Sequence, residues 1–411
     1  MNNMVLKIGN TELGLRALGD GDFEFKNTEV ALNELANFDF VIKNQMNSSP
    51  KASNQKMNTP TLFFNDKLVT LNQVQPNLFE PTSYKLFNDL LRGLVLPNIG
   101  FDSFENEVIA EMPRTAKRGK LAIIVPFFNY SINPRMIQNY KRFRDELGHD
   151  DVFVIESTRE VDFQIPESAN FIRIEAKEEN VMWQKERMIN LAIENLPKEY
   201  TDIAWIDADI LFEDKDWHKE LQDRLNRYSF VQLFNTAEWL NGRGETTEIF
   251  RSPFNTVDRE LRHHVGFAWA ARREVLEKIG GLFDHHVSGN GDAAIYHALA
   301  KSKLDDVASI TAEMFDNLPG FSYSFYCYRE LLSQHTNKSI ACLSGNIKHL
   351  FHGDIGSRNY NGRQQILIQN NFDPLKDLEL DVNGLFRWVD KENTKEMRRL
   401  ICDYFLRTSK A

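Results

Sequence analysis

From Leu121 onward, short apolar segments alternate with segments of helical periodicity, and this alternation constrains the fold of the chain more than any other feature. The first four apolar segments read LAIIVPFF, DVFVIE, NFIRIEA and DIAWID, and Pro134–Leu147 and Val181–Asn195 have helical spacing. Continuous apolar strands separated by helices are typical of a mostly parallel sheet with helices on both faces. The sequence therefore predicts an α/β fold whose ligands bind beyond the carboxyl ends of the strands.

The first 118 residues lack this alternation and predict an N-terminal α+β region. The segment TLFFNDKLVTL, which begins at Thr61, alternates around Asn65-Asp66 and predicts a hairpin, while Ser83–Leu96 has the apolar spacing of a helix. No internal repeat is apparent. We expect an accessory region at 1–118, a central α/β domain at 119–375 and a C-terminal helical tail at 376–411, whose last helix begins near Asn393 or Thr394.

Composition excludes several classes of protein. The net charge of −10 argues against a general surface for polyanions. The three cysteines form no CxxC pair, which indicates a reducing compartment. The N-terminus lacks the layout of a secretion signal, and no apolar run approaches the roughly 18–20 residues that span a bilayer. We therefore expect a cytoplasmic location and no membrane-spanning segment.

The most informative motif is the acidic pair Asp207 and Asp209, which directly follows the apolar strand Ile203–Ile206. Residues two apart in an extended chain face the same side, so both carboxylates can converge on one ligand. Burying a carboxylate is costly unless it is paired or bound to a metal. Hard cations such as Mg²⁺ and Mn²⁺ prefer oxygen ligands, so this position favours a metal site over a pair of solvated turn residues.

Four blocks occur in order between about Lys120 and Trp388: LAIIVPFFN; VFVIES with VMWQKERMINLAI; IDAD; and HVGFAWAARREVLEKIGGLFD…GNGDAAIY with HLFHGDIGSRNY. In this order they resemble the GT-A-fold, nucleotide-sugar-dependent glycosyltransferases, especially bacterial and phage members with a DxD motif and a C-terminal His-Gly motif. The resemblance implies that the central domain is the catalytic domain. It also implies a bacterial or phage-infected cytoplasm as the location.

The resemblance also implies roles for individual residues. The expected metal ligands for Mn²⁺ or Mg²⁺ are Asp207, Asp209 and His352, with His349 as a competitor of His352. Asp292 is the expected catalytic base, although this chain has Gly291-Asp292 where the family usually carries an acidic pair. The expected acceptor residues are Gly266, Trp269 and Gly291. The expected donor-binding residues are Pro126, Phe127, Asn129, Glu156, Gln184, Arg187, Asn190, Asp207, Arg358 and Arg363.

The expected activity is metal-dependent transfer of a sugar from a nucleotide donor, UDP-linked, to a hydroxyl, with inversion at the anomeric carbon. The acceptor is either an oligosaccharide precursor or, as a second choice, a hydroxymethylated pyrimidine in phage DNA. For DNA, the one dense basic cluster is Arg135, Lys141, Arg142 and Arg144. The alternatives are a non-catalytic carbohydrate-binding module, a sugar-1-phosphate nucleotidyltransferase and a glycosidase. The sequence leaves the transferred sugar and the oligomeric state open.

Overall fold

The computed structural model describes six strands of the N-terminal region and, beyond them, residues 119–159, 162–166, 170–299, 309–336, 340–353 and 360–407. The segment Ser83–Leu96, predicted as a helix, and Arg358 lie outside the described residues. Among the helices of the described part, we find none whose length and apolar character would let it cross a membrane.

A seven-stranded sheet organises the larger part of the molecule. Its order is β16-β12-β15-β10-β7-β8-β9, and only β15 runs antiparallel to its two neighbours. The predicted α/β class with a mostly parallel sheet is confirmed. The seven strands in chain order are β7 (Lys120–Phe128), β8 (Val152–Thr158), β9 (Phe171–Glu175), β10 (Tyr200–Ile206), β12 (Phe230–Gln232), β15 (Ala268–Arg272) and β16 (Ile340–Cys342).

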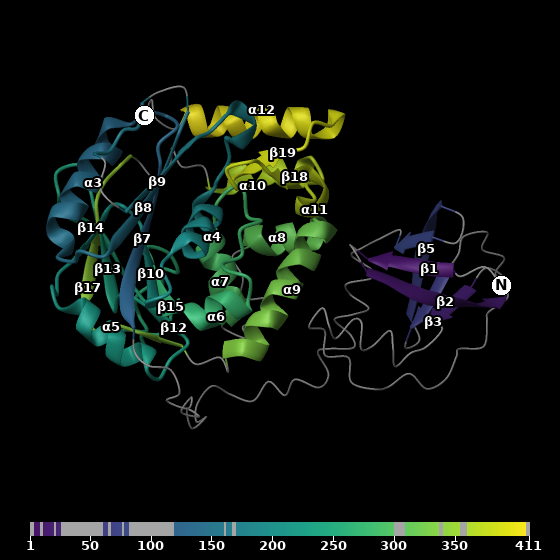
Figure 1. Ribbon diagram of the computed structural model, residues 1–411, viewed down its shortest axis with the longest axis horizontal. Coiled ribbons are helices and arrows are strands. Elements are labelled where there is room, and N and C mark those ends of the chain that lie inside the picture. The colour runs from purple at the N-terminus through teal and green to yellow at the C-terminus, as the bar shows by residue number, and fades with distance from the viewer. Residues whose placement is uncertain are drawn as a thin grey trace.

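Both faces of this sheet are covered because its central strands alternate apolar residues toward two separate cores. In β7, Ile123 and Val125 pack on one side and Ala122 and Ile124 on the other. Figure 1 shows α3 on one side of the strands and α4, α7 and α9 on the other. Helices α3 (Pro134–Leu147) and α5 (Trp217–Leu225) cover the first face. The second face is covered by α4 (Lys185–Asn195), α6 (Arg273–Lys278), α7 (Gly291–Leu299), α8 (Ser309–Asn317), α9 (Pro319–Thr336) and α10 (Tyr360–Gln369).

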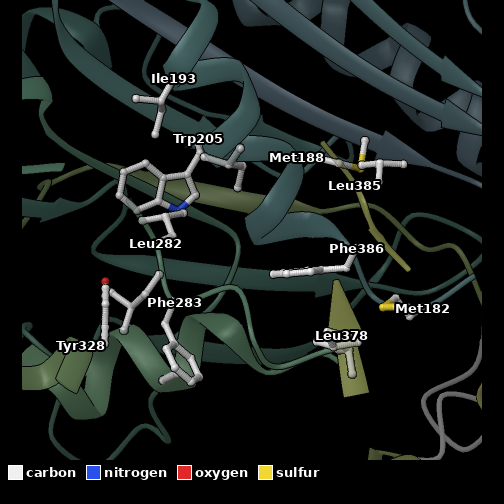
Figure 2. Packing of buried hydrophobic residues seen from close by; sticks show 14 of the residues in the cluster. Met182, Met188, Ile193, Trp205, Leu282, Phe283, Tyr328, Leu378, Leu385 and Phe386 are labelled. Atoms are coloured by element: carbon white, nitrogen blue, oxygen red, sulfur yellow. The ribbon is translucent and has the colours of Figure 1, made fainter. Parts of the chain in front are cut away.

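The larger core joins distant parts of the chain. Trp205 of β10 is packed with Leu282 and Phe283, while Met188 of α4 lies near Leu385 (Figure 2). The C-terminal elements complete this core: α11 (Pro374–Asp377), β18 (Leu378–Leu380), β19 (Phe386–Trp388) and α12 (Glu392–Arg407). The described part of the predicted 376–411 tail, which ends at Arg407, is thus packed into the same core as the central domain.

A second, four-stranded sheet lies at the carboxyl end of β10. Its order is β11-β17-β13-β14, with β11 (Ile210–Phe212), β17 (Asn346–His349), β13 (Thr236–Leu240) and β14 (Thr246–Arg251). Three residues separate the end of β10 from the start of β11, so the chain crosses from one sheet to the other through Asp207, Ala208 and Asp209. The acidic motif is therefore the junction between the two sheets.

Helix α3 begins where its capping residue predicts, whereas α4 begins later than its apolar spacing predicts. Helix α3 begins at Pro134 because the Asn133 side chain caps it by accepting from the Arg135 N–H at 2.9 Å. The expectation of a helix from Val181 is wrong, because α4 begins at Lys185. The Trp183 N–H donates instead to the Val287 carbonyl at 2.8 Å, so this segment is bonded to a distant loop rather than to its own helix.

The six N-terminal strands close into a barrel. The predicted hairpin is one part of it, since Thr61 pairs with Thr70 and Phe64 with Lys67. The barrel strands are β1 (Met4–Ile8), β2 (Thr11–Gly19), β3 (Asp22–Phe25), β4 (Thr61–Phe64), β5 (Lys67–Gln75) and β6 (Leu78–Pro81).

The barrel contains a repeat, so the expectation of none is wrong. Strands β1-β2-β3 and β4-β5-β6 form two antiparallel units of the same design, joined by parallel pairs between β3 and β4 and between β6 and β1. Even the register shift recurs, between Ala17 and Gly19 in β2 and between Gln73 and Gln75 in β5. At one constant offset, Leu6, Leu15, Phe23 and Glu24 are matched by Leu62, Leu71, Phe79 and Glu80.

Candidate functional site

The acidic motif is fixed at both ends by backbone hydrogen bonds. The Asp207 N–H donates to the Phe267 carbonyl at 2.9 Å, and the Asp209 carbonyl accepts from the Leu350 N–H at 2.9 Å. Phe267 has a φ of 82°, a strained value for a residue with a side chain. Backbone of this kind is concentrated at functional sites, and here it aligns the carbonyl that holds Asp207.

Asp209 lies beside two histidines. Strand pairing sets Ile210 opposite His349, so the Asp209 carboxylate reaches the end of β17. Its Oδ2 atom lies 3.5 Å from Nε2 of His349 and 3.3 Å from Nε2 of His352. One ligand atom from each of the three residues lies within 4.8 Å of the others. Carboxylate and imidazole together suit a first-row divalent ion such as Mn²⁺, so these residues fit the expected metal.

Asp207, also expected as a metal ligand, is not part of that group. Its Oδ1 atom forms an ion pair with Nζ of Lys185 at 2.7 Å. The same Nζ also contacts Oδ2 of Asp292 at 2.8 Å. Lys185 is 4% exposed and has two carboxylates as partners. Burial raises the pKa of Asp207 to about 6, against the opposing effect of Lys185. Burial lowers the pKa of Lys185, but the nearby carboxylates together outweigh this effect and hold the pKa above its ordinary value.

These groups line one cavity of about 510 Å³ at the carboxyl ends of β7 and β10. Its wall includes Asp207, Asp209, Asp292, His349 and His352. Of the remaining predicted residues, Pro126, Phe127, Asn129, Gly266 and Arg363 also lie on the wall. The structure thus brings together segments from both sheets, from the start of α7 and from α10.

Several expected donor-binding residues have other partners and are not on this wall. Glu156 is fully buried, and its Oε1 accepts from the backbone N–H groups of Gln164 at 2.5 Å and Ile165 at 3.2 Å. Burial raises its pKa. A carboxylate bonded in this way supports the loop after β8, and its Oε2 lies 3.5 Å from Nε of Arg173.

Gln184, the residue before α4, and Arg187 and Asn190 of α4 hold neighbouring loops. Gln184 donates to the Phe386 carbonyl at 2.7 Å, Arg187 donates to that of Gly384 at 2.9 Å, and Asn190 donates to that of Leu282 at 2.9 Å. Their spacing of three residues puts them near one face of the helix, and this face meets the C-terminal elements and the loop after α6. The structure therefore places them in support of the fold rather than on the cavity.

The expected acceptor residues are also divided. Gly266 lies on the wall and against Asp292, since an added Cβ would come within 3.3 Å of its Oδ2. Trp269 is fully buried in β15, and its Nε1 donates to the Val265 carbonyl at 2.8 Å. Gly291 faces Glu186, whose carboxyl group an added Cβ would overlap.

The structure adds wall residues that the sequence did not single out: Trp183, Lys185, Trp239, His264 and Tyr404. Glu186, just behind the wall, accepts from Nε1 of Trp183 at 2.9 Å. Burial is the main cause that raises the pKa of Glu186, to about 8, and Asp292 adds to it. For Lys185 and Glu186 the sequence signal is weak, because it consists of two charged residues in a segment with helical spacing.

Comparison with known proteins gives a likeness at the level of solved structures. No family model matches the chain, and no curated protein matches it. One similar structure is S. aureus TarS in complex with UDP, with 11% identity over 61% of this chain and 64% of that chain and a TM-score of 0.33. Another is glucosyl-3-phosphoglycerate synthase from Mycobacterium tuberculosis with Mn²⁺ and UDP. It has 15% identity over 64% of this chain and 83% of that chain, and a TM-score of 0.32.

The catalytic domain of Drosophila β1,4-galactosyltransferase 7 with xylobiose has 11% identity over 68% of this chain and 98% of that chain, with a TM-score of 0.30. A mutant of the Drosophila enzyme in complex with manganese and UDP-Gal is also similar. The present chain spans 61% of the length of that mutant chain and 64% of the length of the TarS chain. The case for an activity therefore rests on the site itself.

Proposed function

We propose that this chain is a metal-dependent glycosyltransferase that moves a sugar from a nucleotide donor to a hydroxyl acceptor. The observation that carries the proposal is the group Asp209, His349 and His352, which lies on the same cavity wall as the separate carboxylate of Asp292. A metal site and a carboxylate base facing one cavity are the two components that such a transfer requires. The resemblance of the sequence to GT-A enzymes points to a UDP-linked donor.

The donor end of the cavity is the one that carries the metal site. Asp209, His349 and His352 would hold a divalent ion, Mn²⁺ or Mg²⁺, which supplies a positive charge for the leaving diphosphate. The loop after β7, with Pro126, Phe127 and Asn129, would enclose the nucleotide. Asn129 shapes this loop itself, because its Oδ1 accepts from the Asn133 N–H at 2.8 Å.

Asp292 would act as the base. Its carboxylate takes the proton of the acceptor hydroxyl while the acceptor oxygen bonds to the anomeric carbon and the bond from that carbon to the diphosphate breaks. Direct attack of this kind inverts the anomeric carbon. Lys185 keeps the base in place through its 2.8 Å contact and joins it to Asp207. A product that retains the donor's anomeric configuration would contradict this role of Asp292.

The test is release of UDP from a panel of UDP-sugars in the presence of Mn²⁺. We expect turnover by the intact chain and a loss of at least about a hundredfold in Asp209→Ala, since removal of a metal ligand removes the charge that stabilises the leaving group. Asp145→Ala, an exposed acidic residue of α3, is the matched control and should retain turnover. Binding of sugars without metal-dependent turnover would favour a carbohydrate-binding module instead.

A further inference from the structure

Trp183 is an aromatic residue of the cavity wall that several side chains hold in place. Its indole is half-buried, meets Phe128 edge-on at 5.2 Å, and lies under the guanidinium of Arg363 at 5.6 Å. It precedes α4 in the segment that is bonded to Val287 rather than to the helix. The ring therefore has a defined place in the cavity that helix periodicity does not explain.

Glu186 holds this indole from behind. The residue is 2% exposed, and its Oε2 accepts from Nε1 of Trp183 at 2.9 Å. Its other oxygen, Oε1, is buried with no hydrogen-bond partner among the described residues. Burying a carboxyl group in this way has a cost in free energy, so a structural role alone is a poor account of it.

The room for Glu186 comes from Gly291. Any side chain at this position would overlap the carboxyl group of Glu186. Gly291 is the first residue of α7 and immediately precedes Asp292. The start of α7 therefore links the expected base to Glu186, and Glu186 to the indole.

A series of contacts runs along the cavity wall and behind it. Asp207 contacts Lys185, Lys185 contacts Asp292, and the neighbour of Asp292, Gly291, contacts Glu186. One end of this series, Asp207, is two residues from Asp209 of the metal group. The other end is Trp183, which donates to Glu186. A base must lie between donor and acceptor, so the acceptor belongs on the side of Asp292 that leads to Trp183.

We propose that Trp183 is the platform of the acceptor subsite, that Glu186 is the positioning residue that holds it, and that the acceptor is a neutral glycoside whose sugar ring packs against the indole. This inference rests on the proposed glycosyltransferase activity. A pyranose ring presents C–H groups on its faces and hydroxyls at its edge, which suits an aromatic surface beside polar groups. Arg363 donates toward Asn290 Oδ1 at 3.4 Å, which places amide and guanidinium groups beside the ring.

The charges of the wall favour a neutral sugar over DNA. Asp207, Asp209 and Asp292 all face the cavity, and Lys185 is already paired with two of them. A phosphodiester backbone would meet this acidic wall, and affinity for DNA depends on basic contacts to phosphates. In the basic cluster of α3, Arg142 is paired with Glu146 at 2.9 Å, which reduces the charge that the cluster could offer.

The experiment measures transfer from a UDP-sugar with Mn²⁺ to a panel of p-nitrophenyl pyranosides, with acceptor and donor KM determined separately. We expect Trp183→Ala and Glu186→Ala to raise the acceptor KM about tenfold, a factor equivalent to roughly 1.4 kcal/mol, while the donor KM stays within about twofold. Glu186→Gln keeps an oxygen for the indole and should largely restore the acceptor KM. Trp217→Phe, on the other face of the sheet, is the matched control.

Failures of the two proposals are distinguishable. If the unaltered chain does not bind UDP in the presence of Mn²⁺, the proposed function is wrong and this inference is wrong with it. If donor binding holds but Trp183→Ala and Glu186→Ala leave the acceptor KM unchanged, or change donor and acceptor KM equally, the subsite is wrong. Transfer to DNA containing 5-hydroxymethylcytosine in preference to every glycoside would also overturn it. Calorimetric Mn²⁺–UDP binding checks that each variant is folded.

Discussion

Lys185 shows how one residue can organise a site that is otherwise acidic. Its ammonium lies 2.7 Å from Asp207 and 2.8 Å from Asp292, and it is nearly inaccessible to solvent. A buried cation between two carboxylates fixes both of them, and removal of one partner would leave uncompensated charge. Asp209 is placed separately, beside the two histidines of the proposed metal site.

The two histidines of the metal group can be tested individually. We expect His349→Ala and His352→Ala each to weaken Mn²⁺ binding by at least about tenfold, because each removes one ligand from the group around Asp209. Isothermal titration calorimetry with Mn²⁺ measures the effect. His335→Ala in α9 should bind Mn²⁺ as the unaltered chain does. If either site variant binds Mn²⁺ normally, that histidine is not a ligand.

His286 predicts a pH dependence of stability. Burial and the nearby Arg363 lower the pKa of His286 to about 3. The unfolded chain therefore takes up a proton near pH 6.5 that the folded chain does not, and stability falls as pH decreases below that value, by up to about 1.4 kcal/mol per unit. Urea unfolding from pH 7 to 5 should show a shallower decline in His286→Gln. Equal slopes for the two proteins would contradict this account.

At the scale of elements, the first turns of α4 and α7 are in close contact, and this contact makes a specific prediction. Replacing Gly by Ala at a helical position commonly stabilises by about 1 kcal/mol. Gly291→Ala should instead destabilise, by about 1–3 kcal/mol, because its Cβ overlaps Glu186. In the Glu186→Ala background the same change should be neutral or stabilising. Denaturant unfolding of the four proteins gives the coupling, and additive effects would exclude the contact.

The elements also show what the sequence could and could not predict. The last four residues of the strand before Asp207 and Asp209 are apolar, so the end of the strand and the acidic pair could be predicted from neighbouring residues. The partner of Lys185, Asp292, is 107 positions away, and pairings at such distances depend on how the sheet and helices pack. The same limit applies to Gln184, Arg187 and Asn190. Their side chains donate hydrogen bonds to backbone carbonyls of distant segments rather than to a ligand.

At the scale of the whole molecule, the described cores on the two faces of the large sheet are built from residues between Leu121 and Cys402. A chain comprising residues 119–411 should therefore unfold cooperatively and bind Mn²⁺ as the full chain does. Circular dichroism on heating and calorimetry test this. A chain that ends at residue 375 should fail both measurements, because it lacks Leu385, Phe386 and Trp388 of the larger core. Folding of the shorter chain would show that these residues are dispensable.

The repeated design of the N-terminal barrel has a consequence for how the barrel closes. A single β1-β2-β3 unit leaves two strand edges unpaired, and the parallel seams that close the barrel are contacts between one unit and the other. A chain with one unit would satisfy those edges only by pairing with a second copy of itself, in the manner of a symmetric homodimer. With both units in one polypeptide, closure of the barrel does not depend on protein concentration.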